Sequence, residues 1–387
     1  MALCIGRETD MKTLENKRIV LAVCGSIAAV ETIKLAHELR RRGAEVIPVI
    51  TEAACGIIHP DALTYACATP EITKITGMVE HVLYCGEGGK ADLLLIAPST
   101  ANTISKIACG IDDTIVTTFA TTAIGRGMPI VLAPAMHESM YRHPIVKKNL
   151  ESLPSLGIEV VPPRIEEEKA KIAGIEEICL YAEKALTPQS LAGKKVLITS
   201  GSCREEVDSV RVMTTRSSGK MGREAALEAF RRGADVTVVS NTEVHGKIPC
   251  VKNISITSAS EMAEAVLKQP CPNYYMSAAA ISDFAPVRSA EKIHSGKPVS
   301  IDLQPLPKLI TQMSGKGAKI IGFKIGEDAV DAGRRLLAEE DVILVAANYP
   351  ETMGAKSGEY ILLQEGSETP VSGEKDVIAR KIWDAVL

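Results

Sequence analysis

The sequence predicts an α/β protein made of two doubly wound, parallel-rich, Rossmann-like domains in tandem. Residues 195–240 repeat the plan of residues 18–51: an apolar run ends at glycine, a helical stretch follows, and Arg-Arg-Gly-Ala leads into a second apolar run. This succession is typical of a strand, a helix and a parallel strand. Because the pattern occurs in both halves and strand–helix alternation continues after each copy, the fold class is predicted to be α/β.

The second copy of this plan differs from the first by a long loop. From Gly25 to Arg41 is 16 positions, whereas from Gly201 to Arg231 is 30, so the second copy carries 14 additional residues. They fall beyond the carboxyl end of a predicted strand, where open α/β sheets bind their ligands. We therefore expect two nucleotide-type sites that differ in construction.

Composition narrows the class of protein. A chain of 387 residues fits two or three domains, and 46% hydrophobic residues are enough for large cores. The net charge of −4 gives no general attraction for nucleic acid or anionic membranes. The ten cysteines form no Cys-x-x-Cys pair, and the mixed-charge N-terminus resembles no secretion signal. We expect a cytoplasmic protein that binds neither nucleic acid nor membrane.

In the first half, strand and helix patterns alternate. The stretch 27–42 predicts a helix, and short apolar runs at 92–97 and 130–133 predict strands that are covered on both faces. On the helix over 27–42, Val30, Ile33, Ala36 and Leu39 are expected to form a core-facing stripe. A second helix is expected to open at Ser99, Thr100 or Asn102 and to close at Gly110. A surface loop over 162–174 and an amphipathic helix over 175–186 are expected to follow.

The second half restarts at Lys195 after a short linker. This places a boundary near residue 188 and predicts two domains, over 17–187 and over 190–387. The expectations for this half are a helix over 221–232 with Ala225, Ala226, Ala229 and Phe230 inward, strands over 274–278, 320–323 and 342–346, and a mobile loop over 285–308.

A phosphate site is predicted where the first strand turns into a helix. Residues 25–29 read Gly-Ser-Ile-Ala-Ala, and their free backbone N–H groups with the Ser26 hydroxyl could hold one phosphate. No G-x-G-x-x-G occurs, so a mononucleotide fits better than a dinucleotide. The alternative from this motif alone is a simple turn with Ser26 as the helix cap.

Four segments end strands at one predicted edge of the sheet: GSIAA at 25–29, Thr51, APSTAN at 97–102 and APAM at 133–136. With them, residues 17–185 resemble the flavin-dependent cysteine decarboxylases, the FMN family that includes phosphopantothenoylcysteine decarboxylase. The resemblance implies FMN as the cofactor. The residues that it assigns to FMN are Gly25, Ser26, Thr51, Ser99, Ala101 and Asn102.

The same resemblance implies the catalytic and substrate-binding residues. His81, in MVEHVLY, corresponds to the family's catalytic histidine, and a neutral imidazole can move protons near pH 7. Met136 and His137 correspond to the substrate-binding segment, where the family usually has Asn in place of His137; an imidazolium could also hold the substrate carboxylate. The family's lid cysteine has no counterpart in 163–174. The nearest thiol is Cys179, for which core packing is the alternative role.

A polyphosphate cradle is predicted in the long loop of the second half. Ser218 and Gly219 offer a hydroxyl and open backbone amides, Lys220 offers charge, and a helix N-terminus follows. Because Met221 follows the lysine, the segment is no Walker A loop. Taken alone, a solvated helix start is the alternative interpretation.

Further motifs in the second half are AAAISDF at 278–284, AEKI at 290–293, GFKIGED at 322–328 and AANYPE at 346–351. With these, residues 190–387 resemble phosphopantothenate–cysteine ligases. The resemblance implies that Asp283 recognises the nucleotide, that Lys292 stabilises charge during acyl transfer, and that Ala279 and Phe323 line the nucleotide pocket. Two positions depart from the family. Thr214-Thr215 stands where the family often has Ser-Asn, which leaves the role of that asparagine to Thr215 or Arg216, and the family's basic residue before a proline around 304–307 is missing, with Lys308 just after Pro307.

The tandem order resembles that of the bifunctional coenzyme A biosynthesis proteins. It implies CTP, 4′-phosphopantothenate, L-cysteine and 4′-phosphopantothenoylcysteine as ligands, Mg²⁺ with CTP through ligands that the sequence does not identify, and a homo-oligomer of flavoprotein trimers joined by ligase dimers. Three alternatives stay open: a ligase whose first half only holds FMN as an assembly scaffold, a nucleotide-sensing module without catalysis, and an NAD(P) oxidoreductase, which the missing fingerprint disfavours.

Overall fold

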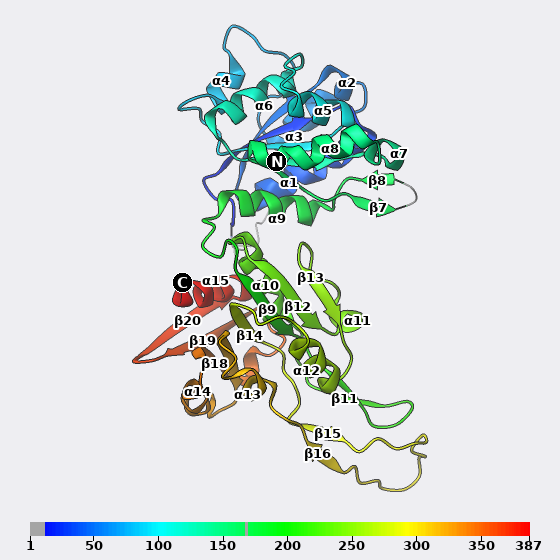
Figure 1. The fold of residues 1–387 in the computed structure, drawn as a ribbon, viewed down its shortest axis with the longest axis vertical. Coiled ribbons are helices and arrows are strands. Elements are labelled where there is room, and N and C mark those ends of the chain that lie inside the picture. Colours follow the sequence, from blue (N-terminus) through cyan, green and yellow to red (C-terminus); the bar gives the residue numbers. More distant parts are fainter. Residues whose placement is uncertain (1–11, 167–168) are drawn as a thin grey trace, which may run out of the picture. The chain divides into compact units, whose positions relative to one another are not determined.

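The computed structural model describes residues 12–166 and 169–387, and the chain divides into two compact units between Pro188 and Gln189 (Figure 1). Each unit is an open, twisted sheet with helices on its faces. The predicted α/β class with parallel-rich sheets is confirmed.

The first unit contains a sheet of five parallel strands in the order β2-β1-β3-β4-β6. The chain winds outward in opposite directions from β1 and β3, so the topological switch point lies between these two strands. The strands are β1 (Arg18–Val23), β2 (Glu45–Ile50), β3 (Leu93–Ser99), β4 (Ile130–Pro134) and β6 (Ile158–Val160).

Both faces of this sheet are buried, which is why its strands are almost wholly apolar. Along β1, Ile19, Leu21 and Val23 belong to one core cluster, and Val20 and Ala22 belong to the cluster on the opposite face. The helices of this unit cover both faces (Figure 1). They are η1 (Ile27–Glu31), α1 (Thr32–Arg41), α2 (Glu52–Cys55), α3 (Pro60–Cys67), α4 (Glu80–Cys85), α5 (Ala101–Ala108), α6 (Ile115–Arg126), α7 (Glu138–Tyr141), α8 (Pro144–Ser152), η2 (Leu153–Leu156) and α9 (Ile175–Leu186).

The helix predicted over 27–42 is broken into η1 and α1. The predicted inward stripe was partly wrong, because the 3₁₀ turn changes the phase: Val30 is 48% exposed, and the buried residues of α1 are Thr32, Leu35, Ala36 and Leu39. The helix after β3 begins behind a Thr100 cap, one of the three caps expected, and α9 has the bounds predicted from its periodicity.

The surface loop predicted over 162–174 contains a hairpin instead. Strands β7 (Arg164–Glu166) and β8 (Lys169–Lys171) pair antiparallel, and β8 pairs with β5 (Met136–His137). Backbone pairing forms these short strands without an apolar period, which explains why the sequence pattern did not reveal them. The segment therefore packs its backbone beside Met136 and His137.

The second unit contains an eight-stranded sheet in the order β13-β12-β9-β14-β17-β18-β19-β20. Its first six strands are parallel and have the Rossmann order, with the switch point between β9 and β14; β19 and β20 add an antiparallel edge. The strands are β9 (Lys195–Ser200), β12 (Asp235–Ser240), β13 (Lys252–Ser255), β14 (Tyr274–Ser277), β17 (Lys319–Ile325), β18 (Val342–Asn348), β19 (Ser357–Gln364) and β20 (Ser367–Glu374).

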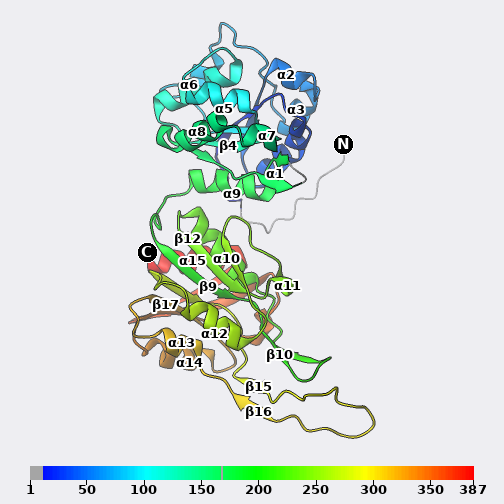
Figure 2. The ribbon, with the colours of Figure 1, turned by 45° about the vertical axis from the view of Figure 1, so that its right-hand side comes forward.

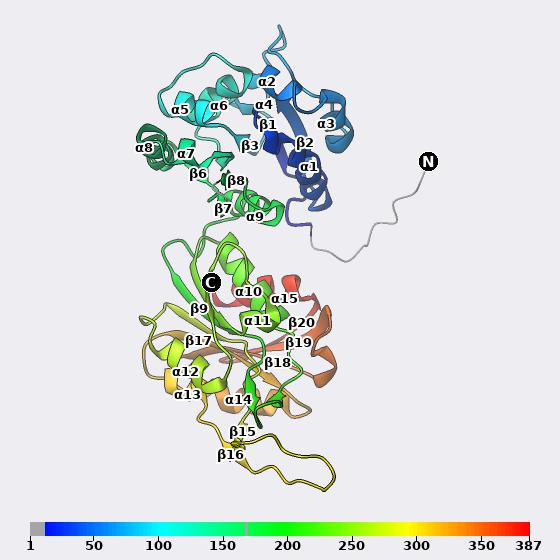
Figure 3. The ribbon, with the colours of Figure 1, turned by 90° about the vertical axis from the view of Figure 1, so that its right-hand side faces the viewer.

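Two further antiparallel pairs lie outside this sheet. The long loop between β9 and α10, here called the inserted loop, carries β10 (Arg204–Glu206) and β11 (Val212–Thr214). The segment predicted as a loop over 285–308 instead forms a second pair, β15 (Phe284–Pro286) and β16 (Leu303–Pro305). Residues 284–305, here called the arm, extend away from the sheet in Figures 2 and 3. The helices are α10 (Lys220–Arg231), α11 (Thr242–His245), α12 (Ala259–Leu267), α13 (Leu309–Met313), α14 (Ala329–Leu337), η3 (Pro350–Thr352) and α15 (Lys375–Val386).

Helix α10, which begins at the predicted phosphate cradle, is fixed by α15. The fully buried Trp383 of α15 donates from Nε1 to the carbonyl of Ala225 at 3.0 Å and meets the Tyr274 ring edge-on at 5.6 Å. Glu228 of α10 is buried with Arg231 and Arg232, and Arg232 also pairs with Asp384 of α15. This packing sets the position of the first turn of α10.

We predict that Trp383→Ala lowers the free energy of unfolding of the second unit by about 3–5 kcal/mol, the usual cost of deleting a buried aromatic side chain. Urea unfolding followed by circular dichroism measures it. Trp383→Phe keeps an aromatic ring in the core but loses the indole donor and part of the packed volume, so its loss should be smaller, about 1–2 kcal/mol. Equal losses for the two variants would contradict this account of the packing.

Candidate functional sites

The four strand ends of the first unit meet at one edge, as predicted, and backbone hydrogen bonds join them. Thr51 N donates to Val23 O at 3.1 Å, Cys24 N to Pro98 O at 3.2 Å, and Ala135 N to Ser99 O at 2.9 Å. Helices η1, α2 and α5 begin at this edge, so three sets of open N–H groups lie at one end of the sheet.

Two residues shape the turn after β1. A Cβ on Gly25 would lie 2.6 Å from Ala53 Cβ, so the backbone approach of the two strand ends requires glycine here. Ser26 caps η1: its Oγ accepts from Ala28 N at 3.4 Å and donates to Ala135 O at 3.3 Å. The cap expected as the alternative role of Ser26 is therefore present, and it also ties β1 to the segment after β4.

Ser99 provides the clearest sign of a ligand at this edge. Its side chain is fully buried, and its Oγ has no hydrogen-bond partner among the residues that the structure describes. A buried hydroxyl without a partner costs free energy that a ligand can recover. Nearby, Ala101 begins α5 and is nearly buried, Asn102 is exposed, and Thr51 caps α2 through Ala54 N at 3.3 Å.

A cavity of about 740 Å³ opens beside this edge. It contains three of the predicted residues, Ser26, Met136 and His137, while Gly25, Thr51, Ser99, Ala101 and Asn102 do not line it. Its walls come from η1, α1, the segment after β4, the β7–β8 hairpin and the start of α9. The lining residues are Ser26, Ile27, Ala28, Val30, Glu31, Thr32, Leu35, Ala135, Met136, His137, Arg164, Ala170, Lys171, Ile172, Ala173, Gly174, Ile175 and Ile178.

His137 is exposed and caps α7. Its Nδ1 accepts from Ser139 N at 3.4 Å and lies 2.9 Å from Ser139 Oγ. This cap engages Nδ1, so Nε2 is the ring nitrogen that remains for a ligand.

His81 lies on α4 and does not line this cavity. Its ring meets Phe119 of α6 edge-on, with centroids 6.4 Å apart. Its Nδ1 is buried and makes no hydrogen bond within the described part of the chain. A buried ring nitrogen without a partner is available to a ligand, as expected of a histidine that handles a proton.

The cysteines near this site are protonated. Cys179 is fully buried in α9, and burial raises the pKa of its thiol to about 12, so core packing, the alternative considered from the sequence, describes it. Burial likewise raises the pKa of Cys24 to about 11, and Thr103 Oγ1 donates to its sulfur at 3.3 Å.

The second unit has a cavity of about 130 Å³ at its switch point, beyond the carboxyl ends of the strands. It brings together five predicted residues, Ser218, Gly219, Lys220, Ala279 and Phe323. Lys220 Nζ donates across it to Gly354 O at 2.9 Å. The complete lining is Ser217, Ser218, Gly219, Lys220, Met221, Ala278, Ala279, Ala280, Phe323, Ile325, Asn348, Thr352, Met353, Gly354, Tyr360 and Lys375.

The His245 ring packs against the loop before α10, and the sequence pattern did not indicate this contact. A Cβ on Gly201 would lie 2.3 Å from the His245 ring, and one on Gly219 would lie 3.3 Å from it. His245 Nε2 accepts from Ser202 N at 3.1 Å, and burial lowers the pKa of this imidazole, which keeps the acceptor neutral. Thr215, a candidate for the family's asparagine role, donates to Ala280 O at 3.0 Å, whereas Arg216 is exposed.

The other two predicted residues, Asp283 and Lys292, are exposed and lie outside the cavity lining. Asp283 is at the root of the arm, where its carbonyl accepts from Leu306 N at 2.8 Å. Lys292 lies on the arm beside Ile293, whose N–H donates to Asp208 at 3.0 Å. This bond and those from Val210 and Arg211 lower the pKa of Asp208, so an ionised carboxylate anchors the Lys292 segment to the inserted loop.

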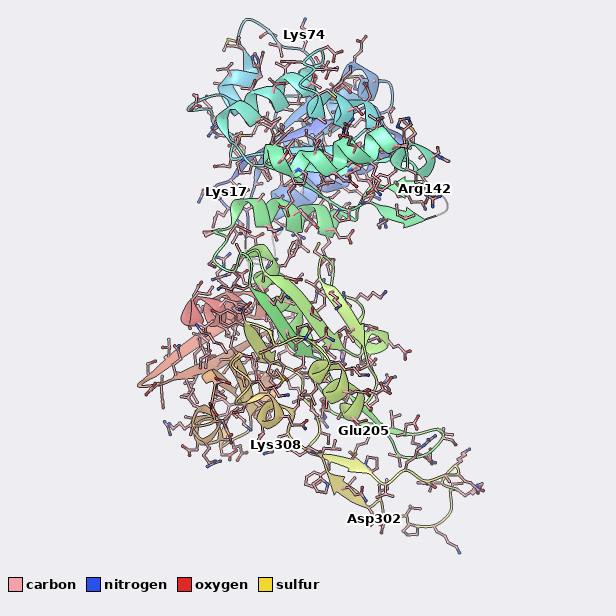
Figure 4. All side chains as sticks on the ribbon, viewed as in Figure 1. Lys17, Lys74, Arg142, Glu205, Asp302 and Lys308 are labelled. Atoms are coloured by element: carbon pink, nitrogen blue, oxygen red, sulfur yellow. The ribbon has the colours of Figure 1, made fainter. Side chains whose placement is uncertain are left out.

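A second missed residue is Lys324, next to Phe323. Burial lowers the pKa of its ammonium, repulsion from Lys308 lowers it further, and attraction to Asp283 opposes both effects. Figure 4 labels Lys308 at the root of the arm and Asp302 along it. Asp283 therefore lies among cations, and the lysine inside the GFKIGED motif was the available signal for this cluster.

Comparison with protein families assigns a class to each unit. The Flavoprotein family model matches residues 7–186, and the model of the DNA/pantothenate metabolism flavoprotein C-terminal domain matches residues 191–387. With the two switch-point sites, these matches define a tandem protein in which a flavoprotein unit precedes an α/β unit of pantothenate metabolism.

Full-length relatives identify the family. The coenzyme A biosynthesis bifunctional protein CoaBC of Thermococcus kodakarensis is 45% identical over 393 residues, covering 98% of this chain and 96% of that protein. CoaBC of Methanocaldococcus jannaschii is 35% identical, with 98% and 95% covered. The chain belongs to the CoaBC family of bifunctional coenzyme A biosynthesis proteins. The predicted family and the prediction of a bifunctional lyase and ligase are confirmed, and the ligase-only alternative is disfavoured.

Two solved structures are each similar to about half of this chain. The C-terminal domain of a CoaBC protein is 26% identical, with 51% of this chain and 96% of that chain covered and a TM-score of 0.42. The FMN-dependent cysteine decarboxylase SpaF is 28% identical, with 45% and 99% covered and a TM-score of 0.40. Within the described residues, no helix is both long and apolar enough to cross a membrane, and no three His, Cys, Asp or Glu side chains gather as a metal site would require.

We predict that Gly25→Ala lowers the flavin content of the purified protein, because the added Cβ would push the turn after β1 away from Ala53. The ratio of visible to ultraviolet absorbance measures it. Gly125→Ala on α6 is the matched control: its Cβ would meet nothing within 4 Å, and alanine should stabilise that helix by about 0.5–1 kcal/mol. A Gly25→Ala protein with unchanged flavin content would contradict this role of the turn.

Proposed function

We propose that this chain catalyses two consecutive steps of coenzyme A biosynthesis: the second unit ligates 4′-phosphopantothenate to L-cysteine, and the first decarboxylates the 4′-phosphopantothenoylcysteine that results. The observation that carries the proposal is that one chain of this family holds two differently built sites, each at a switch point where α/β sheets bind ligands.

Ligation requires activation, because a carboxylate oxygen is a poor leaving group. The carboxylate oxygen of 4′-phosphopantothenate attacks the α-phosphorus of CTP, the bond to the β-phosphate breaks, and pyrophosphate leaves. The cysteine amine then attacks the acyl carbon of the cytidylate; CMP departs and the amine proton passes to solvent. Both steps move negative charge onto oxygens that cations can stabilise.

The second unit offers donors for this charge. Ser218, Gly219, Lys220 and the first turn of α10 bind phosphate oxygens in our proposal, and Ala279 and Phe323 supply the apolar wall of the nucleotide pocket. Lys292 stabilises charge at the reacting groups, and Asp283 accepts from a base amino group or a ribose hydroxyl. Since the described residues form no acidic metal cluster, we infer that Mg²⁺ comes with the triphosphate.

The first unit fits an FMN cofactor. The orphaned Ser99 hydroxyl, the close turn at Gly25 and the three helix N-termini at one edge offer donors to a flavin mononucleotide. Bound FMN would supply a two-electron oxidation of the thiol-bearing carbon and the matching reduction, which allow CO₂ to leave. In this proposal Ser26, Thr51, Ala101 and Asn102 complete the cofactor site.

The substrate is handled by this chain's own side chains. His81 accepts or returns a proton at its Nδ1, and His137 holds the substrate carboxylate beside Met136. The hairpin β7–β8 forms one wall of that cavity. A homo-oligomer and a cytoplasmic location stay predictions.

The decarboxylase half is tested with His81→Asn. We expect the variant to retain flavin and CTP-dependent ligation but to lose CO₂ release by at least about 10²-fold, because asparagine cannot carry the proton. His59→Asn is the matched control: exposed His59 caps α3 through Asp61 N at 3.3 Å, and asparagine caps helices equally well. Normal CO₂ release by flavin-loaded His81→Asn would overturn the assignment.

The ligase half is tested with Lys292→Gln. We expect kcat of pyrophosphate release, measured with phosphopantothenate, CTP and L-cysteine all at saturation, to fall by about 10²-fold, the usual effect of removing one electrostatic stabiliser of a transition state. Lys297→Gln removes another exposed lysine of the same arm and should leave kcat unchanged. Equal rates for the two variants would show that Lys292 is only a solvated surface lysine.

A further inference from the structure

We propose that Lys375, at the start of α15, is a further binding residue of the ligase site that contacts a phosphate group of a substrate. The inference rests on the proposed ligase function and adds a residue that none of the sequence motifs contains. Lys375 lies 155 positions after Lys220, yet both line the cavity of about 130 Å³ at the switch point.

The surroundings of Lys375 are unusual for a lysine. Lys375 is only 7% exposed, and its Nζ donates to Tyr360 Oη at 2.5 Å and to Thr352 O at 3.3 Å. Nζ also lies 4.8 Å from the centroid of the Tyr360 ring. Within residues 12–166 and 169–387, no carboxylate lies within 4 Å of this ammonium, so neutral acceptors are its only hydrogen-bond partners.

A buried ammonium without an anion is costly, and an anionic ligand would offset that cost. An ammonium has three donors, of which two are used here, so one N–H is left for a ligand in the cavity. The opposite wall offers donors of the same kind, namely Lys220 and the first turn of α10 behind Ser218 and Gly219. A group between these walls is surrounded by donors and cations, which is the environment of a phosphate.

The titration of Lys375 provides a specific test. Burial, with a contribution from the charge of Lys220, lowers its pKa to about 8. The titratable groups that face it are Lys220 from α10 and Tyr360 from β19; Glu374 and Asp376 flank it in sequence. A phosphate would favour the charged form and raise this pKa. Ligand binding near pH 8 must therefore take up protons.

The alternative is a purely structural lysine that ties α15 to η3 and β19 through Thr352 and Tyr360. A neighbouring hydrogen bond, from Asn348 Nδ2 to Thr352 Oγ1, orders the same corner and is compatible with both roles. A structural role predicts lower stability without proton uptake and without a selective change in KM. The two roles therefore differ in what binding measurements show.

The first experiment compares Lys375→Met with Lys381→Met, which removes an exposed lysine of the same helix. In the full-length protein, KM for CTP and KM for 4′-phosphopantothenate are each measured with the other substrate saturating. A rise of about tenfold or more in one KM, absent from Lys381→Met, supports the proposal and identifies which substrate carries the phosphate. Two unchanged KM values in a folded Lys375→Met protein would overturn it.

The second experiment does not depend on how the variant folds. Calorimetric titration of the wild-type protein at pH 8 in two buffers of different ionisation enthalpy counts the protons that binding takes up. We expect roughly half a proton for the substrate that contacts Lys375, because a group with a pKa of about 8 is then half protonated. Lys375→Arg, which is charged at every pH, should bind without this uptake. Binding of both substrates by the wild type without uptake would refute the proposal.

Failure of this proposal differs from failure of the ligase assignment. If the wild-type chain forms no pyrophosphate from CTP with phosphopantothenate, the ligase function fails, and the inference fails with it. If the wild type ligates normally while Lys375→Met keeps both KM values, the ligase function stands and only the role of Lys375 is lost.

Discussion

Both sites depend on one constraint of parallel sheets: every strand ends at the same edge, and a crevice opens where the winding direction reverses. In the first unit this point lies between β1 and β3, and in the second between β9 and β14. Backbone bonds such as Cys24 N to Pro98 O and Ala280 N to Gly201 O, at 3.2 and 3.0 Å, fix the segments that leave these strands. The positions of the site residues thus follow from sheet topology, and the connecting loops decide the chemistry.

The loops are built differently in the two units. The first unit uses short turns of small residues, in which Gly25 and Ser26 bring η1 against the strand ends and leave a buried hydroxyl at Ser99 for a ligand. The second inserts a long loop, closed by the β10–β11 pair, and Asp208 in that loop fastens the arm that carries Lys292. The arm is also tied to that loop by the Arg288–Glu206 ion pair at 2.8 Å and by the bond from Ser289 N to Val207 O at 2.9 Å, so the loop sets where Lys292 lies.

Much of this architecture could be predicted, and the failures have physical causes. Long apolar runs and the periodic helix α9 appear at their predicted places because the buried positions of strands and helices must be apolar, and this requirement is visible in the sequence. The pairs β7–β8 and β15–β16 were missed because they are short and held by backbone bonds that leave no periodicity. Val30 was misplaced because a 3₁₀ turn changes the helical phase. Lys375 was missed because only the fold brings it to Lys220, and no local spacing records that proximity.

Four cations of the described residues illustrate two kinds of partner. Arg42 bonds Glu183, and Arg232 bonds Glu228 and Asp384; these buried guanidinium groups face carboxylates and hold helices together. Lys220 and Lys375 instead donate to a carbonyl or a hydroxyl at the switch point, where weak neutral acceptors can be exchanged for a stronger one. A charge already paired with a carboxylate gains little from a phosphate, whereas one held by neutral groups gains a full ionic partner. The absence of carboxylates around these two lysines, within the described residues, is thus the feature that supports the proposed phosphate site at that edge of the second sheet.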